Sequence, residues 1–275
     1  METWDLHLDG AADGRYNMAK DGYLLRRACA TGRPALRLYA WERPTLSVGR
    51  AQRVDAQIDL AACLARGIPV VRRATGGRAV LHGTDVTYSV AAPLDGTRFS
   101  GGIMDIYREL SGAFVRFFRQ LGLEPEVKAY SRGERASQAS AVCFSTPSAF
   151  EILLGQRKIL GSAQRLQAGG FLQHGSLPLL PQADLLAGIF RDASARELSA
   201  QMTDLQSEGC WPGAGLAALH GGIVRAFAQA FGAELTPAPW GAGDAAAVDD
   251  LLAAYPWLAP PEAPARPAQI VRQAP

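Results

Sequence analysis

The sequence lacks the features that mark several common classes of protein. No stretch approaches the ~18 consecutive apolar residues that cross a bilayer, so we expect no contact with membranes. The net charge is only +2 over 275 residues, which argues against a nucleic-acid partner. The first residues, METWDLHLDG, contain neither a basic segment nor an apolar one, so we expect no export and a cytoplasmic location.

Cysteine is scarce and scattered. The four cysteines form no C-x-x-C pair, and no histidine lies at zinc-ligand spacing from any of them, so we expect no metal site. A free cysteine is usually a small buried hydrophobic residue, and we expect this of Cys29 and Cys63. The motifs G-x-G-x-x-G, G-x-x-x-x-G-K-[ST] and G-x-S-x-G are also missing. His82 and His174 have no evident serine and aspartate partners, so nothing recommends a serine hydrolase.

Apolar spacing predicts the main elements. We expect helices from an Asn17 cap to Gly32, over 55–67, from a Ser100 cap to Leu121, over 183–190 and over 219–231. Strands are expected at 34–42, in three pieces of 69–90, and as a meander over 150–180. This order predicts an α/β fold of the α+β type, with a mixed, mainly antiparallel sheet flanked by helices. We expect one domain over 1–237 and a short C-terminal segment over 238–275 that ends in a Pro-rich flexible tail.

The stretch PVVRRATGGRAVLHGTDVTYSV, from Pro69 to Val90, places paired arginines and paired glycines between strands. Two glycines in a turn can be a hairpin and nothing more. The functional interpretation is that Gly76 and Gly77, which have no Cβ, let a ligand contact backbone N–H groups. Arg72 or Arg73 would then hold a phosphate or carboxylate, and on an alternating strand only one of them faces the pocket.

Two further side chains are candidates for chemistry. Lys158 begins an apolar strand and is followed by Gly161, Ser162 and Ala163, which are small where bulk is expected. An edge lysine in water is the plain alternative. Cys143 ends a polar loop just before the strand pair that carries Lys158, and a cationic neighbour would raise its thiolate fraction. A thiolate there would suit acyl transfer through a thioester.

These segments resemble one known family. RRATGGRAVLHGTDVTYSV and CFSTPSAFEILLGQRKILGSAQRLQAGGFLQHGSLPL are similar to motifs of the lipoate–protein ligase A/octanoyltransferase family, as are NMAKDGYLL, PTLSVGRAQ and MTDL. The resemblance covers roughly residues 15–232. It implies a fold like the catalytic domain of biotin and lipoate ligases and class II tRNA synthetases.

The resemblance also implies roles for residues. It implies that Lys158 holds the acyl carbonyl, and that Cys143, followed by Phe144, is the nucleophile, as in the octanoyltransferase branch typified by Gram-positive bacteria. Residues implied to bind the acyl substrate and its carrier are Arg72, Arg73, Thr75, Gly76, Gly77, Arg78, His82, Gly161, Ser162, Ala163, His174 and Gly175. Gly83 stands where family members commonly have Asp, and Asp85 is a candidate for part of that role.

The implied activity is octanoyl transfer from acyl carrier protein to a lysine of a lipoyl domain or of the glycine-cleavage H protein. No cofactor is expected for this reaction. The alternatives are an ATP- and Mg²⁺-dependent lipoate ligase and an amidotransferase between lipoyl-bearing proteins. A binding module that kept the acyl pocket and lost the chemistry is a further alternative. Many ligases also need an accessory C-terminal domain, and after Phe231 only a short, Pro-rich stretch remains in this sequence.

Overall fold

A computed structural model of the chain describes residues 1–54, 56–94, 96, 98–129, 150–167, 169–211 and 215–261. The strands are β1 (Glu2–Ala12), β2 (Ala35–Trp41), β3 (Thr45–Val48), β4 (Val70–Arg72), β5 (Val80–His82), β6 (Asp85–Pro93), β7 (Glu126–Ala129), β8 (Phe150–Leu154), β9 (Arg157–Gln167), β10 (Gly170–Pro178), β11 (Ala233–Pro237) and β12 (Trp257–Ala259). The helices are α1 (Gly14–Thr31), α2 (Leu60–Ala65), α3 (Ile103–Gln120), α5 (Ala183–Ala187), α6 (Ala195–Gln201), α7 (Gly215–Phe231), α8 (Ala242–Asp249) and the short 3₁₀ helix η2 (Leu252–Ala254).

The strands form two sheets. The larger sheet has the order β11-β1-β2-β6-β10-β9-β8-β7, and the smaller one has the order β12-β4-β3-β5. In the larger sheet only the pairs of β1 with β11 and with β2 are parallel. The expected mixed, mainly antiparallel sheet flanked by helices is therefore confirmed.

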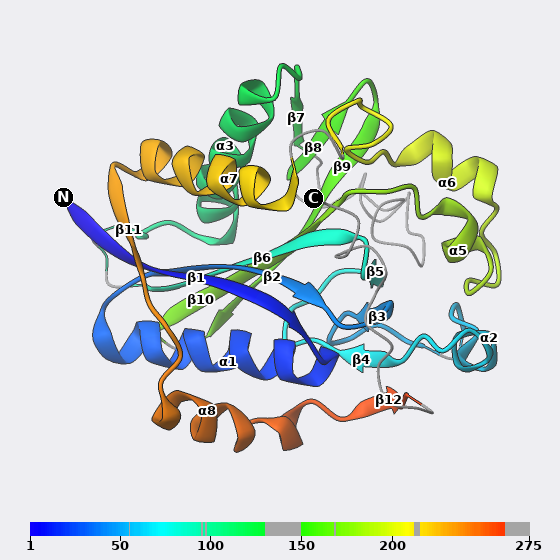
Figure 1. Ribbon diagram of the computed structural model, residues 1–275, viewed down its shortest axis with the longest axis horizontal. Helices are drawn as coiled ribbons and strands as arrows, with labels where there is room; N and C mark the ends of the chain where they lie inside the picture. Colours follow the sequence, from blue (N-terminus) through cyan, green and yellow to red (C-terminus); the bar gives the residue numbers. More distant parts are fainter. Residues whose placement is uncertain are drawn as a thin grey trace.

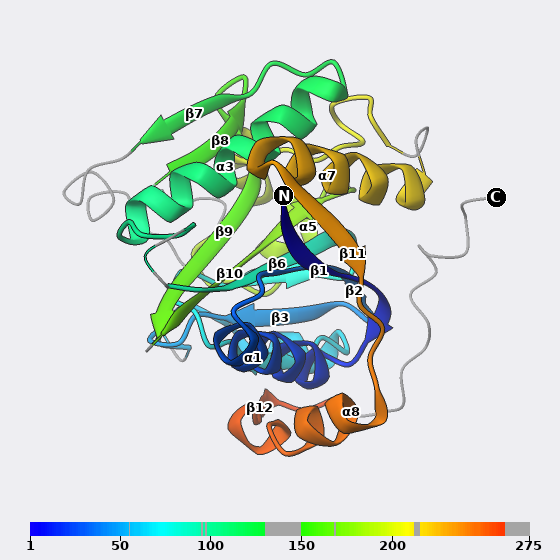
Figure 2. The same ribbon diagram turned by 90° about the vertical axis from the view of Figure 1, so that its left-hand side faces the viewer.

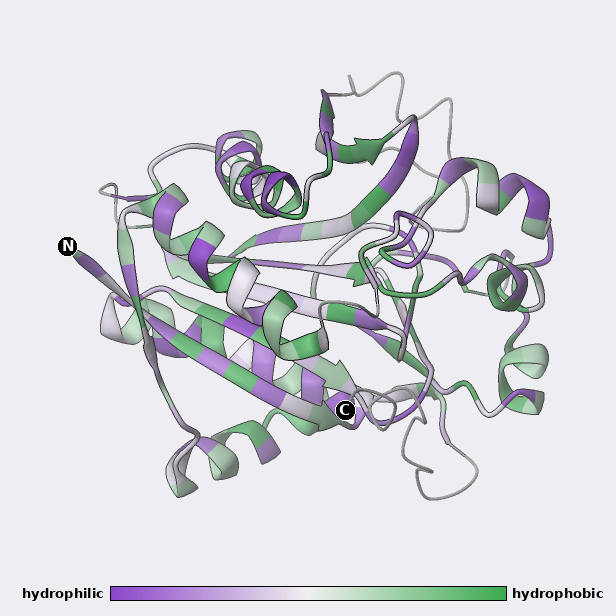
Figure 3. Ribbon diagram, turned by 45° about the horizontal axis from the view of Figure 1, so that its top comes forward, coloured by the Kyte–Doolittle hydropathy of each residue, from purple (hydrophilic) through white to green (hydrophobic). Residues whose placement is uncertain are grey.

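Helices cover both faces of the larger sheet (Figures 1 and 2). Helices α3 and α7 pack together over one face, where Phe114, Phe117 and Phe227 join the largest hydrophobic cluster. Helix α1 packs on the opposite face against β6 and β10, on the side where the smaller sheet also lies. Along β1, hydrophobic and hydrophilic residues alternate (Figure 3), as expected of a strand that divides its side chains between two faces.

Two helices begin at residues other than those expected. Helix α1 starts at Gly14, because the carboxylate of Asp13 accepts a hydrogen bond from the N–H of Arg15 at 2.9 Å. Asn17 lies inside the helix, fully buried, and its side-chain amide donates to the carbonyl of Ala40 at 3.0 Å. Gly32 does end α1, in the left-handed conformation with φ 71°.

Helix α3 starts at Ile103 rather than next to Ser100. Gly102 is its N-cap residue, and the carboxylate of Asp105 accepts from the N–H of Gly102 at 3.2 Å. The carboxylate in the first turn favours the helix N-terminus, which is why the start lies further along the chain than expected.

The segment after Pro237 is folded as far as residue 261. Helix α8 packs on α1, and β12 adds an edge strand to β4. Val248, Leu251 and Tyr255 share a hydrophobic cluster with Met18 and Tyr39. Residues 238–261 therefore extend the expected domain, while the expected flexible tail over 262–275 lies outside the described residues. Across the helices of the described ranges, none combines the length and apolarity of a membrane span.

Candidate acyl-binding site

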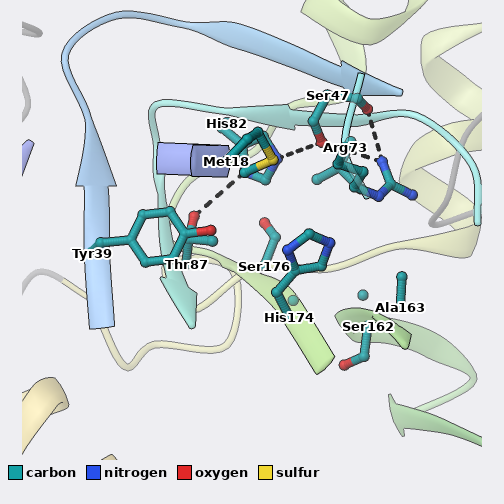
Figure 4. Close-up of a pocket in the computed structure, with 13 residues that line it drawn as sticks. Met18, Tyr39, Ser47, Arg73, His82, Thr87, Ser162, Ala163, His174 and Ser176 are labelled. Carbon is teal, nitrogen blue, oxygen red and sulfur yellow. Dashed lines mark hydrogen bonds between the residues drawn. The ribbon is translucent and has the colours of Figure 1, made fainter. Parts of the chain in front are cut away.

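A narrow pocket lies between the larger sheet, α1 and the smaller sheet. It contains about 320 Å³ of space not filled by protein atoms, its open mouth included, and is lined by Met18, Tyr39, Ser47, Arg73, Val80, His82, Thr87, Gly161, Ser162, Ala163, His174, Gly175 and Ser176. Figure 4 shows Met18, Tyr39 and Thr87 on one side of the pocket and Ser162 and Ala163 on the other, with His174 between them. Segments more than 150 residues apart in the sequence thus meet around one small space.

Arg73 organises the wall of this pocket. Its Nε donates to the hydroxyl of Thr75, and one terminal nitrogen donates to the carbonyl and hydroxyl of Ser47. The other terminal nitrogen donates to the carbonyls of Gly76 and Arg78, both at 2.7 Å. These five bonds equal the five N–H donors of a guanidinium group. Arg73 therefore holds the glycine turn in shape, a role that the sequence did not indicate.

Arg72 points away from the pocket and holds a different loop. Its Nη1 donates to the carbonyls of Gly49, Arg50 and Gln52 at 2.8–3.1 Å. The expectation that only one of the paired arginines faces the pocket is confirmed, and Arg73 is the one that does. An interaction of either arginine with the anionic part of a carrier stays a prediction.

Two hydrogen-bonded chains run through the lining, each from a hydroxyl through an imidazole to a carboxylate. In the first, the hydroxyl of Ser47 lies 2.8 Å from His82 Nε2, and His82 Nδ1 lies 2.8 Å from Asp85. In the second, the hydroxyl of Thr75 lies 2.6 Å from His174 Nε2, and His174 Nδ1 lies 3.0 Å from Asp21.

Some of the donors in both chains can be assigned. Nδ1 of each imidazole lies against a carboxylate, which can only accept, so Nδ1 of His82 and of His174 carries a proton and donates it. Arg73 donates to the hydroxyls of Ser47 and Thr75, which occupies one lone pair on each and leaves each hydroxyl able to donate to, or accept from, the imidazole Nε2. The orientation of both imidazoles is thus fixed by tertiary contacts.

The carboxylates at the ends of these chains are ionised and the imidazole of His174 is neutral. Burial raises the pKa of Asp21, but the hydrogen bond from His174 and the charge of Arg37 outweigh burial and leave the pKa below its usual value. Burial lowers the pKa of His174, and the bond to Asp21 compensates only in part. At Asp85 the hydrogen bonds and charge of His82 overcome burial and lower the pKa. The lining is therefore polar but internally satisfied.

The glycine turn has one position that only glycine fits comfortably. Gly77 has φ 86°, and an added Cβ would lie 2.9 Å from Nη2 of Arg73 and 3.5 Å from the Cβ of Ala163. At Gly76 an added Cβ would meet no atom within 4 Å. Gly49 lies against the turn from the other side, where an added Cβ would come within 2.0 Å of the carbonyl oxygen of Gly77. Gly77 and Gly49 thus allow two backbone segments to touch at the pocket wall.

The β9–β10 hairpin contributes its face with small residues. Gly161, Ala163 and His174 line the pocket. Ser162 also borders it, although its hydroxyl bonds Tyr88 at 2.8 Å on the opposite face of the sheet. A side chain at position 175 would also point to that opposite face, where an added Cβ would lie 2.5 Å from the Tyr88 ring. Gly175 borders the pocket through its backbone atoms.

The backbone conformation after His82 favours a glycine at position 83, where family members commonly have Asp. Gly83 has φ 118°, and an added Cβ would lie 2.9 Å from Cα of Pro44. The carboxylate of Asp85 accepts from the N–H of Gly83 at 2.9 Å and from the hydroxyls of Thr87 and Ser176. Asp85 therefore places a carboxylate next to His82; that it takes part of the role of the family's aspartate stays a prediction.

Lys158 lies in the core next to the pocket rather than in its lining. Its side chain is 1% exposed and forms a buried ion pair with Glu151 across the β8–β9 hairpin. An edge lysine in water is therefore excluded. Arg78 is half-buried beside the turn. Cys143, the predicted nucleophile, lies outside the described residues.

The described cysteines are poor nucleophiles. Cys63 is buried, as expected, and burial together with the charge of Asp59 raises its pKa to about 11. Cys29 is exposed, so the expectation of a buried residue is wrong there. Across the described parts of the chain, no group of three or more His, Cys, Asp or Glu side chains could hold a metal ion.

Several residues in or directly behind the lining escaped the sequence analysis, and two carried a usable signal. Asp21 is a carboxylate on the buried stripe of α1, between Met18 and Leu25. Ser47 is a polar residue within a fully buried strand. Buried polar groups require partners, so both positions indicate a network. Glu151 is likewise a buried carboxylate that requires a partner, and Lys158 is one.

Solved structures share this fold. A lipoate-protein ligase A bound with ATP superposes with a TM-score of 0.76 at 22% identity, covering 92% of this chain and 95% of the ligase. A bi-partite lipoate protein ligase from Thermoplasma acidophilum, solved as part of a lipoylation system with its E2 lipoyl domain, gives a TM-score of 0.74 at 20% identity, with 92% of each chain covered. The fold is thus that of the lipoate ligases.

Sequence comparison narrows this class. Residues 13–210 match the family model of the lipoyl protein ligase A/B catalytic domain, and the chain belongs to that family. Octanoyltransferase LipM of Moorella thermoacetica is 37% identical over 265 residues, which span 92% of this chain and 96% of the relative. Octanoyltransferase LipM of Kyrpidia tusciae is 35% identical over 273 residues, 93% and 97% of the two chains.

Proposed function

We propose that this protein is an octanoyltransferase of protein lipoylation. The observation that carries the proposal is the similarity, over more than nine-tenths of both chains, to proteins named octanoyltransferase LipM. The ligase structures are below 25% identical to this chain, so they support the fold and leave the reaction open. The donor we propose is octanoyl-acyl carrier protein, and the acceptor is a lysine of a lipoyl domain or of the glycine-cleavage H protein, in the cytoplasm.

The pocket supports an uncharged acyl chain as its occupant. Its lining includes the apolar side chains of Met18, Val80 and Ala163, which present no charge to an occupant. The imidazole of His174 is neutral, and the carboxylates of Asp21 and Asp85 are held by donors away from the open space. The bonds of Arg73 to two carbonyls of the turn, to the carbonyl of Ser47 and to the hydroxyls of Ser47 and Thr75 equal its five N–H donors in number, so its cation serves the protein rather than a carboxylate ligand.

The chemistry we propose has two steps. The thiolate of Cys143 attacks the carbonyl carbon of the octanoyl thioester, a new C–S bond forms, and the bond to the pantetheine sulfur breaks. The uncharged amine of the acceptor lysine then attacks the same carbon, its nitrogen gives up one proton to balance the released pantetheine thiolate, and the tetrahedral intermediate expels the thiolate of Cys143. Lys158 and the backbone N–H groups of the Gly76–Gly77 turn would stabilise the oxyanion, and one such donor is typically worth ~3 kcal/mol. No nucleotide takes part.

Intact-protein mass spectrometry tests the proposal. Incubation with octanoyl-acyl carrier protein should add one octanoyl group on Cys143, and a Cys143→Ser enzyme should not transfer it. Cys29→Ser is the matched control, because Cys29 is exposed and lines no part of the pocket. Attachment of free octanoate or lipoate only when ATP is present, with Cys143→Ser still active, would favour the ligase. Transfer from octanoyl-H protein alone would favour the amidotransferase, and binding without turnover would leave an acyl-binding module.

A further inference from the structure

A second cleft lies beside the acyl pocket and is electropositive. About 570 Å³ of space not filled by protein atoms, the open mouth included, lies here between α1, the ends of β9 and β10, and η2. Its lining residues are Gly22, Leu25, Arg26, Ala74, Arg165, Gln167, Leu172, Leu251, Ala254 and Tyr255. Two of them are arginines, and among the described residues that line the cleft none is acidic. None of the family motifs considered above assigns a role to this cleft.

The cleft adjoins the acyl pocket along the same face of the hairpin. In the register of β9 and β10, His174 is opposite Ala163, and both line the acyl pocket. Two residues further along each strand, Leu172 is opposite Arg165, and both line the cleft. Two residues of strand span about 7 Å. Ala74 lines the cleft and its neighbour Arg73 lines the acyl pocket, so adjacent residues border the two spaces.

The two arginines of the cleft have donors to spare. In the described ranges neither Arg26 nor Arg165 lies within 4.0 Å of a carboxylate, and the single hydrogen bond of Arg165 is a long one, 3.5 Å to the carbonyl of Ala74. Arg27, the next residue of the same helix, is different: it pairs with Asp244 at 3.1 Å and with Asp5 at 3.6 Å. The chain therefore neutralises one arginine of this helix and leaves its neighbour open to an external anion.

Tyr255 adds a neutral donor to the pair of cations. Its side chain is buried, and its hydroxyl oxygen lies against Gly22, where an added Cβ would come within 2.5 Å of it. Among the described residues this hydroxyl has no hydrogen-bond acceptor. Burial raises the pKa of Tyr255, and so does the charge of Asp21, while Arg165 and Arg26 act in the opposite direction. Both arginines line the same cleft as the phenol, which keeps its proton.

We propose that this cleft binds a small anion, a carboxylate or a phosphate group, between Arg26 and Arg165 with the hydroxyl of Tyr255 as a further donor. Guanidinium groups pair with both kinds of oxyanion through two parallel hydrogen bonds. The apolar floor of Leu25, Leu172 and Leu251 suits a short hydrocarbon part next to the charged group. Neither arginine lines the acyl pocket, so binding here does not depend on octanoyl transfer.

Isothermal titration calorimetry on the full-length protein tests this site. Butanoate and inorganic phosphate are titrated separately at low ionic strength, which distinguishes a carboxylate from a phosphate ligand. At least one probe should bind with a millimolar or lower Kd. Arg26→Gln and Arg165→Gln should each weaken binding by about tenfold or more, roughly the loss of one charge-assisted hydrogen bond. Tyr255→Phe should weaken it less.

The control is Arg116→Gln, which removes the same charge from an exposed position of α3 far from the cleft. It should change the Kd by less than about twofold, because only distant, screened charge is lost. Absence of heat with both probes at millimolar concentration would overturn the proposal. Unchanged binding in the Arg26→Gln/Arg165→Gln double variant would do the same. Since the titration needs no turnover, repeating it in Cys143→Ser separates failure of this site from failure of the transferase proposal.

Discussion

Arg73→Lys is the most informative single change, because it keeps the charge and removes the geometry. The guanidinium of Arg73 donates to three carbonyl oxygens, of Ser47, Gly76 and Arg78, and to two hydroxyls, of Ser47 and Thr75. An ammonium group has three donors on a single nitrogen, so at least two of these acceptors lose their partner. All of them lie in or beside the acyl pocket, where water is a poor substitute.

The size of the effect follows from the bonds lost. Hydrogen bonds to charged groups contribute roughly 1.5–3 kcal/mol each, so losing two should lower the free energy of unfolding by about 3–6 kcal/mol. That is a large share of the ~5–15 kcal/mol that stabilises a typical domain. Urea denaturation followed by tryptophan fluorescence measures the change. Octanoyl transfer should fall as well, since the glycine turn and both imidazole chains depend on Arg73.

Arg72→Lys is the matched comparison. Arg72 is half-buried, and a single nitrogen makes its three bonds to carbonyls of the 49–52 loop. A lysine ammonium can form similar bonds to these carbonyls, and water can reach any carbonyl that the lysine leaves unpaired. We therefore expect the free energy of unfolding to fall by about 1 kcal/mol or less. Equal stability losses in the two variants would refute the assignment of Arg73 as the residue that shapes the turn.

Three further predictions test other parts of the core. Glu151→Gln leaves the buried ammonium of Lys158 without its carboxylate and should cost about 3–5 kcal/mol in urea unfolding, whereas the Glu151→Leu/Lys158→Met pair should recover much of it; no recovery would contradict this account. Gly77→Ala should cost about 1–3 kcal/mol, because φ is 86° and Cβ meets Arg73, while Gly76→Ala should be near neutral; equal losses would argue against a strained turn. Burial lowers the pKa of His7 to about 4, so as the pH falls the unfolded chain binds this proton before the folded chain does. The free energy of unfolding should therefore fall by about 2–3 kcal/mol between pH 6.5 and 4. The His7→Leu variant should not show this fall.

Much of the architecture could be predicted from local sequence. The β8–β9–β10 meander, the helices near Gly32 and Leu121 and the mixed sheet follow from apolar periodicity, which reports burial on one face or on two. The helix starts were wrong by a few residues, because capping depends on which carboxylate reaches a free N–H, as Asp13 and Asp105 do. Strands β7, β11 and β12 and helices α6 and α8 were missed, and these lie at sheet edges or on the outer surface, where the hydrophobic pattern is weak. Strand β1 was missed as well, although it lies inside the sheet between β11 and β2 and its hydrophobic and hydrophilic residues alternate.

The sequence by itself determined the order of elements, the family motifs and the set of small and polar residues from which the pocket is built. Only the tertiary structure decided what each of them does. The side chain of Arg73 faces the pocket and holds the glycine turn, whereas that of Arg72 holds the 49–52 loop. Lys158 forms an ion pair with Glu151 in the core. Asp21 and Asp85 became the ends of two hydrogen-bonded chains, in which Ser47 lies 35 positions from His82 and His174 lies 153 positions from Asp21 along the polypeptide. Hydrogen bonds act over about 3 Å in space, and no spacing in a linear sequence encodes which distant groups come that close.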